Sequence, residues 1–98
     1  ASRSPALPEL PTIAESGYSG FDTGSWIGLL APAGTPTAIV NKVSADLREV
    51  LALPDTKNTL ITQGATPWPM TPEQFAARIN SDRQRYGKVI EENNLSAD

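Results

Sequence analysis

The run SWIGLLAPAGTP at residues 25–36 begins as an apolar stretch and stops at a proline that suits the start of a helix. Successive side chains of an extended strand point to opposite faces. One face of a strand here would carry Trp26, Gly28 and Leu30, and the other would carry Ile27, Leu29 and Ala31. A strand that is apolar on both faces is normally covered on both, as in a parallel or mixed sheet flanked by helices. The run therefore predicts a buried strand at residues 25–31. Covering two faces takes more protein than the remainder of the sequence offers, so we expect a larger fold around it.

Length and charge narrow the classes of protein that fit. A chain of 98 residues suffices for one small domain or for part of a larger one. The net charge of -3 and the lack of a local basic run give no reason to expect binding to nucleic acid or to an anionic membrane. No apolar run approaches the roughly 20 residues that span a bilayer, and no charged and then apolar leader opens the sequence. We expect that any export signal has been removed or lies upstream.

The residue types leave little room for catalysis. Cysteine and histidine are both absent, which excludes thiolate and imidazole chemistry. The 11 acidic residues are scattered and show no metal-ligand spacing. The run GYSG at residues 17–20 resembles a nucleophile elbow, but Phe21 stands where the motif needs glycine and no histidine serves as base. We expect no catalytic residue, no metal site and no cofactor, and the chain is not expected to be an enzyme.

The middle of the sequence predicts a long helix followed by a short one. Thr35 is a good N-cap residue and Pro36 suits the first helical position. Apolar residues then recur at the spacing of one helix face until Pro54, whose ring clashes with the preceding turn and ends the helix. A second, short helix is predicted at residues 55–63.

The C-terminal third predicts the second long helix. Thr71 and Gln74 form a capping box, and an apolar stripe continues to about residue 93. The proline-containing segment at residues 65–69 could form a strand only at the edge of a sheet.

The N-terminal segment is predicted to be extended, with one short helix. Thr12 and Glu15 have the spacing of a capping box, and Gly17 can end this helix in the left-handed conformation. The whole pattern predicts an α/β chain in which one or two strands pack with two long and two short helices.

Phe21, Asp22 and Trp26 are the candidate ligand-binding residues. Asp22 lies in a glycine-flanked loop between two aromatic residues, and loops held by rigid elements commonly contact ligands. The alternative, which these residue types favour, is that Phe21 and Trp26 pack in a core or hinge and that Asp22 is a turn residue.

Three blocks of the sequence resemble the C-terminal part of one receptor family. These blocks are LPELPTIAESGY at residues 7–18, WIGLLAPAGTP at residues 26–36, and TPEQF with YGKVI in the last helix. They resemble the Bug, or TctC-type, extracytoplasmic solute receptors of tripartite tricarboxylate transporters. The likeness covers essentially all of the chain, with the blocks in the family's order.

This resemblance implies the C-terminal part of a type II periplasmic-binding-protein-like fold. In that fold two α/β lobes are joined by crossing strands, and a small carboxylate is bound between them. Residues 1–24 would form an extended segment, a short helix and an inter-lobe crossing, and residues 25–98 the C-terminal part of lobe one. The resemblance also implies a periplasmic location, with a small carboxylate ligand and membrane transporter subunits as partners of the full-length receptor.

Two hypotheses about the isolated chain follow. The glycine-rich loops with which the family recognises a carboxylate have no counterpart here, so we expect little solute affinity from this chain alone and self-association through its unpaired strand edges. The alternative is a freestanding helix and strand module that self-associates without binding small molecules. A long upstream reading frame beginning with a signal peptide would favour the receptor, and a start codon near residue 1 would favour the module.

Overall fold

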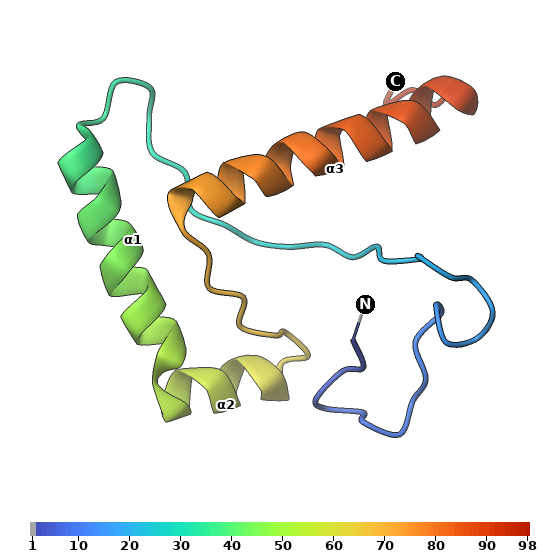
Figure 1. The fold of residues 1–98 in the computed structure, drawn as a ribbon, viewed down its shortest axis with the longest axis horizontal. Coiled ribbons are helices and arrows are strands. Elements are labelled where there is room, and N and C mark those ends of the chain that lie inside the picture. The colour runs from blue at the N-terminus through green and yellow to red at the C-terminus, as the bar shows by residue number, and fades with distance from the viewer. Residues whose placement is uncertain (1) are drawn as a thin grey trace.

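The computed structural model describes residues 2–98 and contains three α-helices in that range (Figure 1). They are α1 (Thr37–Ala52), α2 (Pro54–Thr62) and α3 (Pro72–Glu92). Helix α1 contacts both of the others. Residues 2–36 form turns and extended chain, part of which passes alongside the first half of α3 (cyan in Figure 1).

The predicted break between α1 and α2 is confirmed. Leu53 is extended, with φ -64° and ψ 135°, and Pro54 begins α2 at a position that needs no backbone N–H. The predicted cap of α1 is wrong by one residue. Pro36 occupies the cap position and has no side-chain atom that could accept a capping hydrogen bond, while the Thr35 hydroxyl donates to the carbonyl of Pro32 at 2.8 Å. That hydroxyl stabilises the preceding turn instead of the helix.

The predicted start of α3 is confirmed in atomic detail. The backbone N–H of Gln74 donates to Thr71 Oγ1 at 3.2 Å, and the N–H of Thr71 donates to Gln74 Oε1 at 2.9 Å. Both bonds of the capping box therefore satisfy backbone donors that the first turn of a helix leaves free. The helix ends at Glu92, one residue before the predicted end.

The predicted strands are not seen in the part of the chain that the structure describes. Residues 25–31 are extended but pair with no other segment, and residues 65–69 form no strand either. A strand needs a neighbour to accept and donate its backbone hydrogen bonds, and within residues 2–98 the chain offers none. The described residues are thus helical and irregular, so the strand content of the expected α/β fold is not shown.

The short N-terminal helix was also predicted wrongly. Its capping box forms, since the N–H of Glu15 donates to Thr12 Oγ1 at 3.1 Å and the N–H of Thr12 donates to Glu15 Oε2 at 2.7 Å. Gly17 takes the expected left-handed conformation, with φ 113°. The segment nevertheless forms turns only. A helix this short does not recover the cost of its first turn without packing.

Burial is the feature in which this chain departs most from a compact domain. Its accessible surface is 8104 Å², roughly 1.5 times the area of about 5400 Å² exposed by a compact monomer of 10.4 kDa. The radius of gyration is 16.5 Å, whereas a compact domain of this length has about 13 Å. No apolar side chain within residues 2–98 is buried. The expected burial of residues 25–31 on both faces is therefore not met by this chain, in which Ile27 is 103% and Leu30 77% exposed.

Among the described residues, no helix combines the length and the apolar character that a membrane crossing requires.

Candidate functional site

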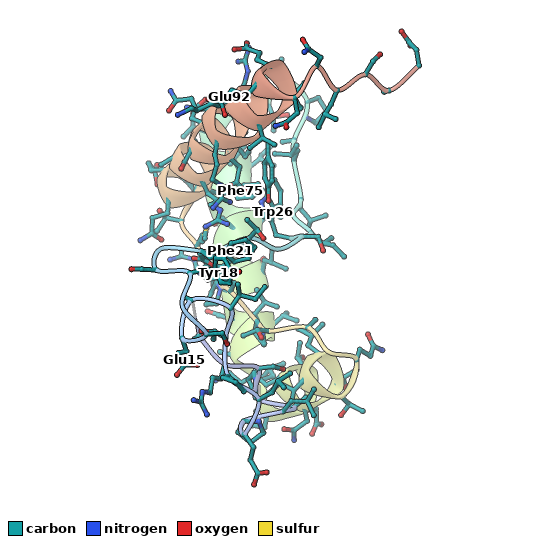
Figure 2. The ribbon with its side chains drawn as sticks, turned by 90° about the vertical axis from the view of Figure 1, so that its right-hand side faces the viewer. Glu15, Tyr18, Phe21, Trp26, Phe75 and Glu92 are labelled. Carbon is teal, nitrogen blue, oxygen red and sulfur yellow. The ribbon has the colours of Figure 1, made fainter. Side chains whose placement is uncertain are left out.

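The candidate site is the place where residues 22–28, here called the docked segment, lie against α3. Figure 2 shows the side chains of Trp26 and Phe75 next to each other. Their ring centroids are 5.2 Å apart and their planes meet at 80°, which is the favourable edge-to-face arrangement. Two residues later the backbone comes so close to the same ring that a Cβ at Gly28 would lie 2.5 Å from Phe75 Cζ. A side chain at position 28 would therefore have to displace the ring or the backbone, so this close approach favours glycine.

Asp82 holds the docked segment through its carboxylate. Its side chain is buried, with only 6% of the residue exposed. Trp26 Nε1 donates to Asp82 Oδ2 at 2.7 Å, and two arginines donate the other hydrogen bonds to this carboxylate. Arg78 Nε donates to Oδ2 at 3.1 Å, and Arg85 Nη2 donates to Oδ1 at 3.0 Å. A buried charge is tolerated only when it is paired and hydrogen-bonded. Below, these four residues are called the Asp82 clamp.

The surroundings of Asp82 favour its charged form. The hydrogen bond from the Trp26 indole is the largest cause that lowers the pKa of the Asp82 carboxyl below its ordinary value, and the two arginines act in the same direction. Burial opposes them, because the loss of water penalises the charged form. The net effect is a lowered pKa, so Asp82 is ionised at neutral pH.

The two arginines extend the clamp to other parts of the chain. Arg85 Nη1 donates to the main-chain carbonyl of Asp22, which fixes the start of the docked segment. Arg85 Nε is buried and has no hydrogen-bond partner within residues 2–98. The guanidinium of Arg78 lies 4.7 Å from the ring centroid of Trp68, a cation–π contact with the connection between α2 and α3. The clamp therefore joins three segments that are distant in sequence.

The structure places Phe21 and Asp22 at one hollow and Trp26 at another. Trp26 and Asp22 both belong to the docked segment, where the first uses its indole N–H and the second its main-chain carbonyl to contact α3. Phe21 lies next to Tyr18 in Figure 2, and together with Asp22 it lines a hollow of about 240 Å³ whose other walls include Leu7 and further residues of the N-terminal segment. Contact of any of the three with a ligand stays a prediction.

A larger, open hollow of about 730 Å³ lies between the docked segment and α3. Its walls are residues 23–26 on one side and Ile79, Asp82, Arg83 and Tyr86 on the other. The described residues contain no group of three acidic side chains arranged to hold a metal ion. The contacts of this site hold the backbone of residues 22–28 in place against α3.

Reasoning from the sequence missed the clamp, because it treats Asp82 as one of several scattered acidic residues. A signal was present in the spacing. Arg78, Asp82 and Arg85 are separated by four and three residues, so they share one face of a helix. The partner Trp26 is 56 residues away in the sequence, and no local pattern indicates that pairing.

Comparison with known proteins places this chain in a family. Residues 1–95 match the model of the family described as "Tripartite tricarboxylate transporter family receptor" (TctC). The chain is similar to the "UPF0065 protein in tcbD-tcbE intergenic region" of Pseudomonas sp. (strain P51), with 38% identity over 97% of this chain and 29% of the relative. It is also similar to "Protein BugT" of Bordetella pertussis (strain Tohama I), with 34% identity over 92% of this chain and 28% of the relative.

These relatives are much longer than the chain described here, which spans less than a third of either of them. No solved structure matches it. The match to the family model nevertheless extends over nearly every residue. The chain therefore belongs to the tripartite tricarboxylate transporter receptor family, TctC.

Proposed function

We propose that this chain is the C-terminal portion of a periplasmic solute receptor that binds small carboxylates and passes them to transporter subunits in the membrane. Family membership supports the receptor class. The observation that carries the proposal is the docked segment and its continuation to residue 31. One side of this extended chain is held on α3, while Ile27, Leu29 and Leu30 are exposed. A segment of this kind is suited to join a sheet supplied by the rest of the receptor.

In the proposed receptor, residues 1–24 contain an inter-lobe crossing and residues 25–98 belong to lobe one. The distribution of hydrogen bonds supports this division. Arg3 donates to Glu15 within the N-terminal segment, with Nε and Oε2 2.9 Å apart, whereas residues from Asp22 onward are attached to α3. The surplus exposed surface of the chain has the same explanation, because packing against the remainder of two lobes would cover it.

Phe21, Asp22 and Trp26 remain our candidates for contact with the solute. The structure constrains what each could offer. The indole N–H of Trp26 is already bonded to Asp82, so this residue would contribute its ring and not its donor. Phe21 lies at the other end of the loop and is 40% exposed, about as much as Trp26 at 38%. We propose no catalytic role for any of the three, since the family is one of receptors.

Calorimetry with succinate, malate and citrate tests the proposal on two samples. We expect the full-length receptor to bind at least one of them in a one-to-one complex and to give no heat with glucose, a neutral control. The isolated 98-residue chain is expected to give no binding heat with any of them, because the other lobe is missing. Tight one-to-one binding by the isolated chain would overturn the structural role. Binding of none of the three acids by the full-length receptor would overturn the ligand class.

The exposed segment also supports self-association of the isolated chain. Ile27 is fully exposed on an unpaired extended segment, and such edges tend to pair with a second copy. We expect sedimentation equilibrium to show a concentration-dependent dimer or larger assembly, and Ile27→Lys to shift it toward monomer. A wild-type chain that stays monomeric at every concentration would contradict this expectation and would also count against the alternative of a freestanding, self-associating module.

A further inference from the structure

The described hydrogen bonds divide the N-terminal part of the chain into a part bonded to itself and a part bonded to α3. Within residues 2–21, the hydrogen bonds connect this segment to itself, as in the bonds of Arg3 with Glu15 and of Thr12 with Glu15. No hydrogen bond in the described structure links residues 2–21 to a helix. From Asp22 onward the chain is attached to α3 by Arg85, Asp82 and Phe75. The hydrogen bonds to α3 thus begin at Asp22, which together with Thr23 also lines the hollow of about 240 Å³ formed with the N-terminal segment.

The residues just before this boundary are suited to bending. Gly17 and Gly20 have positive φ angles of 113° and 78°, and a Cβ built on either would meet no atom within 4 Å. The three backbone hydrogen bonds donated by residues 17–21 go only to nearby carbonyls and tie this segment to no helix, and in the first of them the N–H of Gly17 donates to the carbonyl of Ala14 at 3.3 Å. The N–H of Tyr18 donates to the carbonyl of Ile13 at 3.4 Å, and the N–H of Phe21 donates to that of Tyr18 at 3.0 Å. Hinges are commonly a few loop residues that absorb changes in φ and ψ in this way.

The residues just after the boundary are suited to staying fixed. Asp82 is the most buried residue of the described chain and has three donors from three different side chains. The Trp26 ring adds an edge-to-face contact with Phe75. To move the docked segment as one piece, both contacts and the bond between Arg85 and Asp22 would have to break together.

We propose that the Asp82 clamp fixes residues 22–28 to lobe one, so that the two lobes of the receptor rotate about residues 17–21. Asp82 is then a positioning residue that sets where the hinge ends, and Gly17 and Gly20 supply its freedom. This inference rests on the proposed function, in which residues 1–24 contain the inter-lobe crossing. It adds to that function a location for the pivot and the side chains that limit it.

The test measures the distance between the two sides of the hinge in the full-length receptor without solute. Glu9 and Lys57 are exposed, on the N-terminal segment and on α2 respectively, and both are replaced by cysteine and spin-labelled. Asp82→Asn and Trp26→Phe remove, respectively, the charge and the indole donor of the clamp. We expect each substitution to broaden the distance distribution and to add a second population, because the pivot would then extend from residues 17–21 into residues 22–28.

Two matched controls keep the test specific. Asp46→Asn makes the same chemical change at an exposed carboxylate of α1, which accepts from Lys42 Nζ at 2.7 Å, and is expected to leave the distribution unchanged. Gly20→Ala places a side chain at φ 78° inside the proposed pivot, and we expect it to shift or narrow the distribution. Gly24→Ala, where a Cβ meets no atom within 4 Å, is expected to have no such effect.

Thermal unfolding of every variant separates positioning from folding. If Asp82→Asn and Trp26→Phe lower the melting temperature but leave the distance distribution as in the wild type, the clamp is merely structural and the proposal is overturned. An unchanged distribution in Gly20→Ala would overturn the location of the pivot. Because no solute is present, these outcomes are independent of calorimetry. If the receptor bound none of the carboxylates but its distance distribution broadened on loss of the clamp, the proposed ligand class would be refuted and the proposed hinge would stand.

Discussion

Gly28→Ala is expected to displace the docked segment from α3 and to lower the free energy of unfolding of the full-length protein by about 1–3 kcal/mol. The added Cβ would lie 2.5 Å from Phe75 Cζ and 3.2 Å from both Cε atoms of that ring. A shift of the ring would alter its edge-to-face contact with Trp26, at a centroid distance of 5.2 Å. Either the ring or the backbone must move, and both movements disturb the contact between Trp26 and Asp82.

Denaturant unfolding of three variants checks this expectation. Gly24→Ala is the matched control, since a Cβ there meets no atom within 4 Å, and its midpoint should stay close to that of the wild type. Phe75→Leu combined with Gly28→Ala shortens the side chain that the new methyl group meets, so the double variant should recover part of the loss. Equal unfolding midpoints for Gly28→Ala and Gly24→Ala would show that the close approach at Gly28 does not affect the free energy of unfolding.

The helices could be predicted from the sequence because their signals are local. Pro54 separates α1 from α2 by its own geometry, and the capping box of Thr71 and Gln74 needs only residues three apart. Such features depend little on the rest of the protein. They give helix positions correct to about one residue even in a chain that has no buried apolar side chain among its described residues.

The predicted strand at residues 25–31 is not confirmed, because a strand depends on non-local contacts. Its apolar pattern predicts a strand with a partner on each edge and a covering layer on each face. Segments distant in sequence must supply these partners. The prediction of the short helix at Thr12 failed in a related way. There the capping box forms as expected, but a cap does not make a helix when no packing stabilises the turns that follow.

The candidate site was half visible in the sequence. Trp26 and Asp22 were singled out for their place in a glycine-flanked loop, and both take part in the contact with α3. Asp82 was not, because its significance comes from burial and from a partner 56 residues away. The spacing of the two arginines around it indicates a shared helix face, yet the same spacing occurs in many exposed salt bridges.

The clamp also shows how a chain with so much exposed surface still takes a defined path at one place. Its most buried residue is a carboxylate, and each of its partners is a directional donor. Apolar packing alone would allow the docked segment to slide along α3. Hydrogen bonds from Trp26 to Asp82 and from Arg85 to Asp22 fix its register instead.

Asp82→Asn is expected to destabilise the full-length protein at neutral pH and to lose this effect in acid. The pKa of Asp82 is lowered in the folded protein, chiefly by the hydrogen bond from Trp26, whereas in the unfolded chain it returns toward its ordinary value of 3.8. The ionised carboxylate therefore contributes stability that is fully present above the unfolded value and is lost as the pH falls through the folded one. The difference in unfolding free energy between the wild type and Asp82→Asn should be constant between pH values of about 8 and 5 and shrink below that.

The same pH titration in a Trp26→Phe background tests whether the Trp26 hydrogen bond causes the lowered pKa of Asp82. Without the indole donor, the largest contribution to the lowered pKa of Asp82 is gone, so the pH-dependent part of the difference should become smaller. Glu15 does not interfere with the measurement. Its pKa is lowered to about 2 by the hydrogen bonds from Arg3 and Thr12, but it is present in every variant and cancels in each difference. If the difference between wild type and Asp82→Asn kept its neutral value throughout acidification, the charge of Asp82 would have no part in holding the docked segment, and shape alone would have to explain the clamp.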